Sequence, residues 1–272
     1  MSEYQSFYEM VKKWTINDYR TQKVKSEVIV DMLISDFIEE MVSYGVKNDN
    51  VRLIAKEFPI ERISQAENEH QYASVDYLLS DMSNNVYLTE LKTTTDSFDI
   101  VQLLNMLGVC KRDICELRNP LEYAVLDYGI QKRFNDRGTK KYLYTMKKMI
   151  DYCKLEQRDV SSFSDNKRSG DKQKIIAKKI IDDVFKKLES AKAKTKILYI
   201  SLHKIEDKME NAQIPDGLQY KDFLLKPIIL SDMIDDDDFI KKLSPEKQSV
   251  WKKTTDIIKD MLKPYSDWYN YI

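Results

Sequence analysis

Two apolar, β-branched segments joined by a short polar connection constrain the fold most strongly. "YASVDYLLSD" at 72–81 and "VYLTELKT" at 86–93 have the length and composition of buried strands, and the intervening "MSNN" predicts an antiparallel hairpin. Asp76 lies within the first segment, and Glu90 and Lys92 lie within the second. Charged groups in buried strands are costly without partners, so these three side chains need either partners or a chemical role.

The length of the hairpin loop decides whether the charges meet. Side chains alternate between the two faces of a sheet, so an odd loop ("MSN" or "SNN") sets Asp76 opposite Glu90 or Lys92 on one face. The four-residue loop 82–85 would send Asp76 to the other face. We predict the odd register, or a β-bulge that restores it. The competing interpretation is an exposed Glu–Lys pair on an edge strand that discourages aggregation, although apolar residues flank both charges.

Hydrophobic periodicity predicts helices before and after these strands. The expected elements are a helix over 17–44, strands over 51–60, 72–81 and 86–93, a helix over 98–118, helices over 139–155 and 171–193, a strand over 196–202, an edge strand over 223–230, and helical segments over 236–262 with a break at Pro245. Asn17 is expected to cap the first helix, and Asp96 or Ser97 the helix after the hairpin. Strands flanked by helices predict an α/β fold in which helices cover both faces of a sheet.

The three charged residues of the hairpin have the composition of a metal site. Carboxylates such as Asp76 and Glu90 are ligands for a hard cation, Mg²⁺ or Mn²⁺, and the backbone carbonyl of Leu91 can add a third oxygen. Such an ion polarises a scissile phosphate and acidifies a bound water molecule. Lys92 could orient that water and neutralise charge that develops on the phosphate.

This arrangement resembles the PD-(D/E)XK nuclease superfamily, which includes type II restriction enzymes, Holliday-junction resolvases and RecB-like exonucleases. The pattern is Asp76, thirteen residues, then Glu90-Leu91-Lys92. The resemblance implies a restriction-endonuclease-like core: a helix, three antiparallel strands, a helix and a parallel strand. We expect a single domain over 1–272, with this core at about 17–118 plus 196–230, a helical insert at about 119–195 and a mainly helical C-terminal part at about 231–272.

The resemblance implies two further site residues. Glu27 on the first helix would complete the metal site, with Asp31 one turn later as the reserve, and Gln102 on the helix after the hairpin would assist catalysis. Glu27 on a surface helix also fits a solvated role. Val75 stands where the family name has proline, and Met106 ends the QxxxY pattern typical of the RecB branch, so no branch is assigned.

The implied function is metal-dependent hydrolysis of phosphodiester bonds, with DNA rather than RNA as the expected substrate. One alternative is a catalytically inactive nuclease-fold protein that binds nucleic acid or protein. A third interpretation is a fold of another class in which the hairpin charges are structural. No motif that reads base sequence is present, and endo- or exonucleolytic cleavage is left open.

Nucleic acid needs basic contacts to its phosphates, and the chain carries two basic stretches although its formal net charge is −1. The first stretch covers 132–148, and the second covers 166–196 and contains eleven basic and four acidic residues. We expect at least one stretch to line the approach to the metal site; the ordinary alternative is the solvated face of amphipathic helices. The candidate nucleic-acid contacts of the first stretch are Lys132, Arg133, Arg137, Lys140 and Lys141, followed by Lys147 and Lys148, with Phe134, Tyr142 and Tyr144 interleaved.

The remaining features indicate a cytoplasmic protein. The three cysteines form no CxxC pair, which gives no support for structural zinc or an iron–sulfur cluster. The first residues lack the apolar core of a signal peptide, and no apolar run is long enough to cross a membrane. Both a second copy of the chain and a protein partner are left open.

Overall fold

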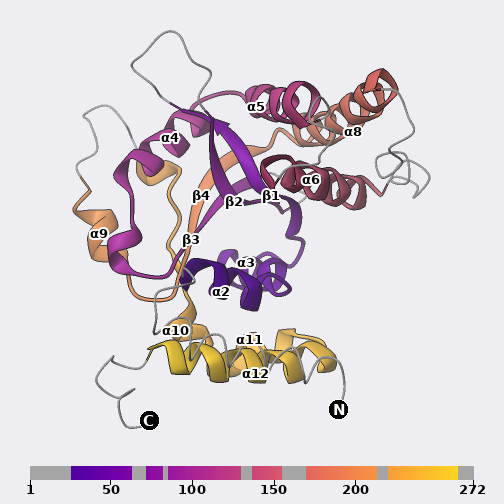
Figure 1. Cartoon of the computed structure of the whole chain (residues 1–272). Helices are drawn as coiled ribbons and strands as arrows, with labels where there is room; N and C mark the ends of the chain where they lie inside the picture. Colours follow the sequence, from indigo (N-terminus) through magenta and orange to yellow (C-terminus); the bar gives the residue numbers. More distant parts are fainter. Residues whose placement is uncertain are drawn as a thin grey trace.

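The protein has an α/β fold in which helices cover both faces of a five-stranded mixed sheet (Figure 1). The computed structural model describes residues 26–62, 72–81, 85–129, 137–154, 170–212 and 220–262. The strands are β1 (Arg52–Glu61), β2 (Tyr72–Ser80), β3 (Asn85–Lys92), β4 (Lys194–Ser201) and β5 (Ile228–Ile229), and they lie in this order across the sheet. β1, β2 and β3 are antiparallel neighbours, whereas β4 is parallel to β3 and β5 is parallel to β4.

The central strand β3 is buried along almost its whole length, because helices cover both of its faces. On one face, β-strand residues such as Leu88 and Ile197 pack with helices from the middle of the chain. These helices are α4 (Ile100–Cys110), α5 (Arg118–Glu122), α6 (Arg137–Cys153) and α8 (Gly170–Ser190), with 3-10 turns at Thr95–Ser97 and Ile114–Leu117, a π-helical segment at Tyr123–Gly129, and α9 (Glu206–Glu210) after β4. This first core therefore joins the predicted insert 119–195 directly to the sheet.

A second core covers the opposite face and joins the N- and C-terminal parts of the described chain. Its helices are α2 (Ser26–Ile34), α3 (Ile38–Val46), α10 (Leu230–Met233), α11 (Asp237–Lys242) and α12 (Pro245–Leu262), with a 3-10 turn at Tyr220–Asp222 before β5. Figure 1 shows α12 on the outer side of α2 and α3. The ring of Trp251 on α12 lies edge-on to Phe37 at 5.0 Å and to Phe239 at 5.1 Å. The C-terminal helices thus complete the core under β2, β3 and β4.

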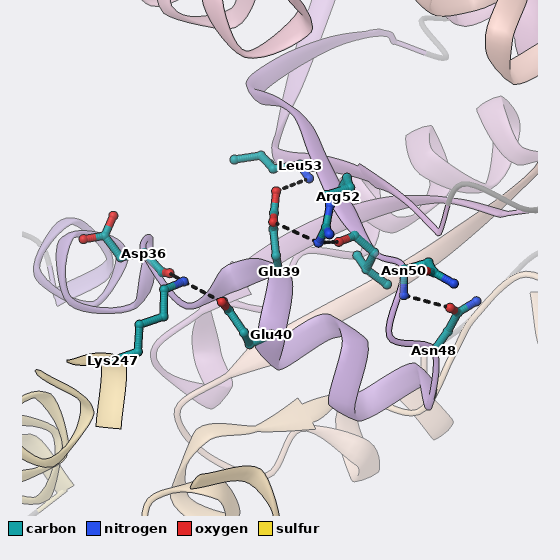
Figure 2. Close-up of polar contacts among 9 residues, drawn as sticks. Asp36, Glu39, Glu40, Asn48, Asn50, Arg52, Leu53 and Lys247 are labelled. Carbon is teal, nitrogen blue, oxygen red and sulfur yellow. Dashed lines mark hydrogen bonds and ion pairs between the residues drawn. The ribbon is translucent and has the colours of Figure 1, made fainter. Parts of the chain in front are cut away.

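Polar contacts fasten α12 and β1 to the start of α3 (Figure 2). Lys247 on α12 donates hydrogen bonds to the backbone carbonyl of Asp36 and to the carboxylate of Glu40. The carboxylate of Glu39 accepts a 2.8 Å bond from the backbone N–H of Leu53 at the start of β1. The first turn of α3 is therefore tied to both the sheet and the C-terminal helix.

The helix expected over 17–44 is two helices in the described part of the chain. The break falls at 35–37, where Phe37 has φ −112° and ψ 1°, outside helical values, and is buried against Trp251. Tertiary packing of Phe37 and the Lys247 contact at Asp36 outweigh the local helical periodicity. The predicted cap at Asn17 lies outside the described residues.

Two expectations for the helix after the hairpin are wrong in detail. Asp99 caps α4, accepting a 2.8 Å bond from the backbone N–H of Val101, because the predicted caps Asp96 and Ser97 are used in a 3-10 turn closed by Thr94. Helix α4 ends at Cys110 rather than near 118.

Of the two edge strands, the first lies within one residue of its expected bounds and the second is much shorter than expected. β1 continues through Pro59 to Glu61, which an edge strand permits because its outer N–H groups are not needed for pairing. The strand expected over 223–230 is reduced to the two residues of β5, with an isolated bridge between Leu224 and Ile197. No helix in the described part of the chain is long and apolar enough to span a bilayer.

Candidate active site at the end of the β2–β3 hairpin

The β2–β3 hairpin has the odd register that the sequence analysis predicts. Tyr77 pairs with Thr89 and Leu78 with Leu88. Continued by one residue, this register sets Asp76 opposite Glu90, and alternation puts Lys92 on the same face as Glu90. The prediction that the hairpin brings these three charges together is confirmed.

A buried aspartate holds the register. Asp81 is only 2% exposed, and its backbone N–H donates a 3.2 Å bond to the Asn85 carbonyl. Its carboxylate accepts from the backbone N–H and the side-chain amide of Asn85. The same carboxylate accepts a 3.1 Å bond from the hydroxyl of Tyr87. Asp81 and Asn85 are opposite each other, with the three residues "MSN" between them in the sequence. The contacts of the Asp81 side chain with Asn85 therefore favour the odd loop.

Asp76 lies where β2 and β3 stop pairing. Its carboxylate accepts a 2.7 Å bond from the backbone N–H of Leu91, in place of a backbone acceptor on β2. The carbonyl of the next residue, Lys92, faces β4, where it accepts from Leu202. Since successive carbonyls in a strand alternate in direction, the Leu91 carbonyl faces the β2 side. The Leu91 oxygen is therefore directed to the side of the strand on which Asp76 lies.

Lys92 and Glu90 are a buried pair, 6% and 5% exposed. The Lys92 ammonium lies 3.5 Å from Oε1 of Glu90 and donates a 2.8 Å bond to Oε1 of Gln102 on the first turn of α4. The Gln102 side chain also hydrogen-bonds the Glu90 carboxylate. With its oxygen on Lys92, Gln102 presents its amide to Glu90, and so orients both charged groups.

The two carboxyl groups hold protons more tightly than ordinary carboxyls. Burial is the main cause for both: it raises the pKa of Asp76 to about 6 and, with the negative charge of Asp76 and a hydrogen bond to it, the pKa of Glu90 to about 8. The backbone N–H of Leu91 and the charge of Lys92 act in the opposite direction on Asp76. Near neutral pH the pair therefore shares a proton unless a cation replaces it.

The first helix contributes Asp31 rather than Glu27 to this cluster. Asp31 accepts a hydrogen bond from the Tyr77 hydroxyl and lies 3.6 Å from the ammonium of Lys56 on β1. Its negative charge also raises the pKa of Asp76. Glu27 is half-buried one turn earlier and, within the described residues, makes no hydrogen bond or ion pair. Of the two helix acids that the sequence analysis considers, the reserve choice is the one beside Asp76.

A strained residue on β1 faces the site. Glu57 lies opposite Asp76, between the pairs Lys56–Tyr77 and Phe58–Val75, and has a φ of 50°. A non-glycine residue in this left-handed region costs on the order of 1–3 kcal/mol. The alternation of faces is interrupted here, because Val75 packs in the first core whereas Tyr77 packs in the second. The charge of Glu57 adds to the raised pKa of Asp76.

The oxygen atoms of this site suit Mg²⁺. The described residues contain no group of three or more acidic, histidine or cysteine side chains that forms a metal cluster by itself. Mg²⁺ does not require one, since it is usually held by one or two carboxylates and keeps several water molecules. Oε2 of Glu90 is buried without a hydrogen-bond partner in the described structure, and Asp76 lies opposite. A cation would relieve both the unpaired oxygen and the repulsion between the two carboxylates.

The candidate nucleic-acid contacts are only partly described. Lys132 and Arg133 lie outside the described residues, and Arg137, Lys140 and Lys141 belong to α6 with side chains that are not described. Further along α6, the Lys148 ammonium lies 5.6 Å from the ring centroid of the exposed Tyr144. Thr145, the neighbouring residue, donates a 2.9 Å bond to the carbonyl of Lys56, one position before Glu57. This part of the basic stretch is thereby anchored to β1 beside the acidic site.

Sequence reasoning missed the β1 contribution and the Asp81 contacts. Lys56 and Glu57 lie in a segment whose residue pattern is typical of an ordinary edge strand. No residue pattern in the sequence indicates that a glutamate has a positive φ. Asp81 carries a weak one, since an aspartate that starts "DMSNN" is typical of a turn. A pocket of about 1050 Å³, lined by residues that include Cys115 and Lys194, lies at the opposite end of the sheet.

Comparison with known proteins adds no assignment. No family model matches the chain, and neither a curated protein nor a solved structure matches it.

Proposed function

We propose that the protein is a metal-dependent nuclease that hydrolyses phosphodiester bonds, with DNA as the first substrate to test. The observation that carries this proposal is Asp76 opposite Glu90 at the splayed end of the hairpin, with Lys92 buried beside them. Two carboxylates and one lysine on adjoining strands are the groups that phosphate hydrolysis with Mg²⁺ or Mn²⁺ requires.

The order of elements supports the same proposal. A helical pair, three antiparallel strands, helix α4 and the parallel strand β4 follow one another as in the restriction-endonuclease-like core of PD-(D/E)XK nucleases. The three charged residues lie at the positions on β2 and β3 where that family carries its motif. The resemblance thus extends from the motif to the arrangement of strands around it.

Each residue then has a definite role. Asp76 and Glu90, with the Leu91 carbonyl, would hold Mg²⁺, which when bound polarises the scissile phosphate and acidifies a water molecule. The carboxyl pair would give up its shared proton to hold a cation, because metal ligands must be deprotonated. Lys92, oriented by Gln102, lies against Glu90 and is available to position the attacking water and neutralise the phosphate. Asp31 adds negative charge on the helix side of the site.

A cleavage assay with a matched lysine control tests the proposal. Wild-type protein, Lys92→Met and Lys196→Met are incubated with single- and double-stranded DNA and RNA in the presence of Mg²⁺, Mn²⁺ or EDTA. Lys196 lies on β4 beside Tyr87, toward the other end of the sheet, so its variant should cleave normally. We expect metal-dependent cleavage that is lost only in Lys92→Met.

Two results would overturn the enzyme proposal. One is no cleavage of any substrate by the wild type, in which case retained nucleic-acid binding would favour the inactive binding module. The other is equal cleavage by Lys92→Met, which would identify a contaminating nuclease.

A further inference from the structure

Two buried polar atoms beside the candidate metal site lack hydrogen-bond partners in the described structure. One is Oε2 of Glu90 and the other is the hydroxyl of Tyr199 on β4. Tyr199 is fully buried and Glu90 is 5% exposed, so bulk water does not satisfy either atom. Leaving a buried polar group unpaired costs about 1–3 kcal/mol, which makes two such atoms in one site unusual.

The two residues are neighbours across the sheet. Glu90 on β3 is paired in register with Tyr199 on the parallel strand β4, so both side chains leave the sheet on the same face. The ring of Phe98, just before α4, lies 5.6 Å from the Tyr199 ring and limits its movement. The phenol is thereby confined to the space between β3 and the start of α4, where Gln102 reaches Glu90.

The two atoms are chemically complementary. A phenol keeps its proton at neutral pH and can therefore donate a hydrogen bond from its hydroxyl. An ionised carboxylate only accepts hydrogen bonds. A bond between them would satisfy both atoms and would be strongest when Glu90 is ionised.

We propose that Tyr199 is a positioning residue of the metal site: its hydroxyl donates to Oε2 of Glu90, directly or through one water molecule, and fixes the orientation of the carboxylate that holds the cation. This inference rests on the proposed metal-dependent function. It adds a residue from β4 to a site otherwise built from β1, β2, β3 and the helices, and the parallel strand then holds one ligand in place. Hydrogen-bonded partners of metal-ligating carboxylates typically change metal affinity by about 10–100-fold when they are removed.

Calorimetric titration with Mn²⁺ tests the role of Tyr199 without relying on cleavage. The proteins compared are the wild type, Tyr199→Phe and Tyr152→Phe. Tyr152 on α6 is a buried phenol of the same core, with the Lys187 ammonium 4.2 Å from its ring, and it lies near the Asp81 end of the hairpin. We expect Tyr199→Phe to weaken Mn²⁺ binding about 10-fold and Tyr152→Phe to leave it unchanged.

A crystal structure of the Mn²⁺-loaded wild type provides the second measurement and does not depend on how well a variant folds. We expect the Tyr199 hydroxyl to hydrogen-bond Oε2 of Glu90 or to share one ordered water with it. Equal Mn²⁺ affinity of wild type and Tyr199→Phe, or a loaded structure in which the two atoms share neither contact, would overturn the role of Tyr199 and leave the nuclease proposal intact. A wild type that binds no Mn²⁺ would overturn both proposals.

Discussion

The carboxylate of Asp76 accepts a 2.7 Å hydrogen bond from the backbone N–H of Leu91, fifteen residues later in the chain. This bond replaces the backbone acceptor that β2 no longer supplies where the two strands separate. It holds one oxygen of Asp76 against β3 at Leu91, the residue that follows Glu90. The same side chain therefore closes the open end of the hairpin and belongs to the candidate metal site.

Asp76→Asn should separate these two roles. Asparagine retains an oxygen that can accept from Leu91, so the thermal midpoint should change little, whereas the lost charge should weaken Mn²⁺ binding by at least about 100-fold, beyond the usual effect of indirect partners. Calorimetric titration and thermal unfolding measure the two effects. Asp99→Asn is the matched control, because asparagine caps helices as well as aspartate does. Equal Mn²⁺ affinity in both variants would contradict the ligand role of Asp76.

The raised pKa values predict how metal-free stability depends on pH. Between the ordinary carboxyl range near pH 4 and the folded values of about 6 and about 8, the folded protein keeps protons that the unfolded chain has released. The stabilising contribution of this pair is thus complete below about pH 4 and is lost as pH rises through about 6 to 8. Glu90→Gln should flatten this part of the profile.

Urea unfolding at intervals from pH 5 to 8.5, in EDTA, measures this dependence. Adding Mg²⁺ to the wild type should restore stability most at the upper end of the range, because the cation then replaces no proton. A wild-type profile parallel to that of Glu90→Gln would show that the carboxyl pair does not hold the extra proton.

Asp81→Ala should disturb the hairpin register. The substitution removes the buried acceptor for Asn85 and Tyr87, and the loss of stability should be on the order of 3 kcal/mol. Cleavage should fall as well, because the register sets Asp76 opposite Glu90. Asp113→Ala, which removes an exposed cap from Cys115, should cost only about 1 kcal/mol and leave cleavage unchanged. Wild-type stability and cleavage in Asp81→Ala would show that the register does not depend on this carboxylate.

Trp251→Ala tests whether the C-terminal helices belong to the same folding unit as the sheet. The buried indole contacts Phe37 and Phe239, so its removal should cost about 3–5 kcal/mol. If the helices and sheet unfold together, the single transition should move as a whole in far-UV circular dichroism and in near-UV circular dichroism of the tyrosines. Two separated transitions would show that α12 unfolds independently.

Much of the site was accessible from residue patterns because the chemistry lies on regular strands. Asp76, Glu90 and Lys92 stand out as charges in apolar runs, and strand alternation is enough to predict which of them share a face in a given register. Gln102 was named only through the resemblance to the nuclease superfamily. The helices of 139–155 and 171–193 were recognisable from their amphipathic periodicity, and their bounds differ by only a few residues in the structure.

Other features depend on contacts between residues far apart in the chain. Sequence periodicity identified a helical region before β1, but packing of Phe37 against Trp251 broke it into two helices. The same packing geometry favoured Asp31 over Glu27, since Asp31 meets Tyr77 and Lys56 from two different strands.

Local pattern alone thus specified the α/β class, the hairpin and the three charged residues, because each follows from burial and alternation along one segment. The left-handed Glu57, the position of Asp31 and the pairing of Tyr199 with Glu90 arose only in the folded protein. Each of these depends on the energy of buried polar groups, which is set by neighbours that the chain brings together from distant positions.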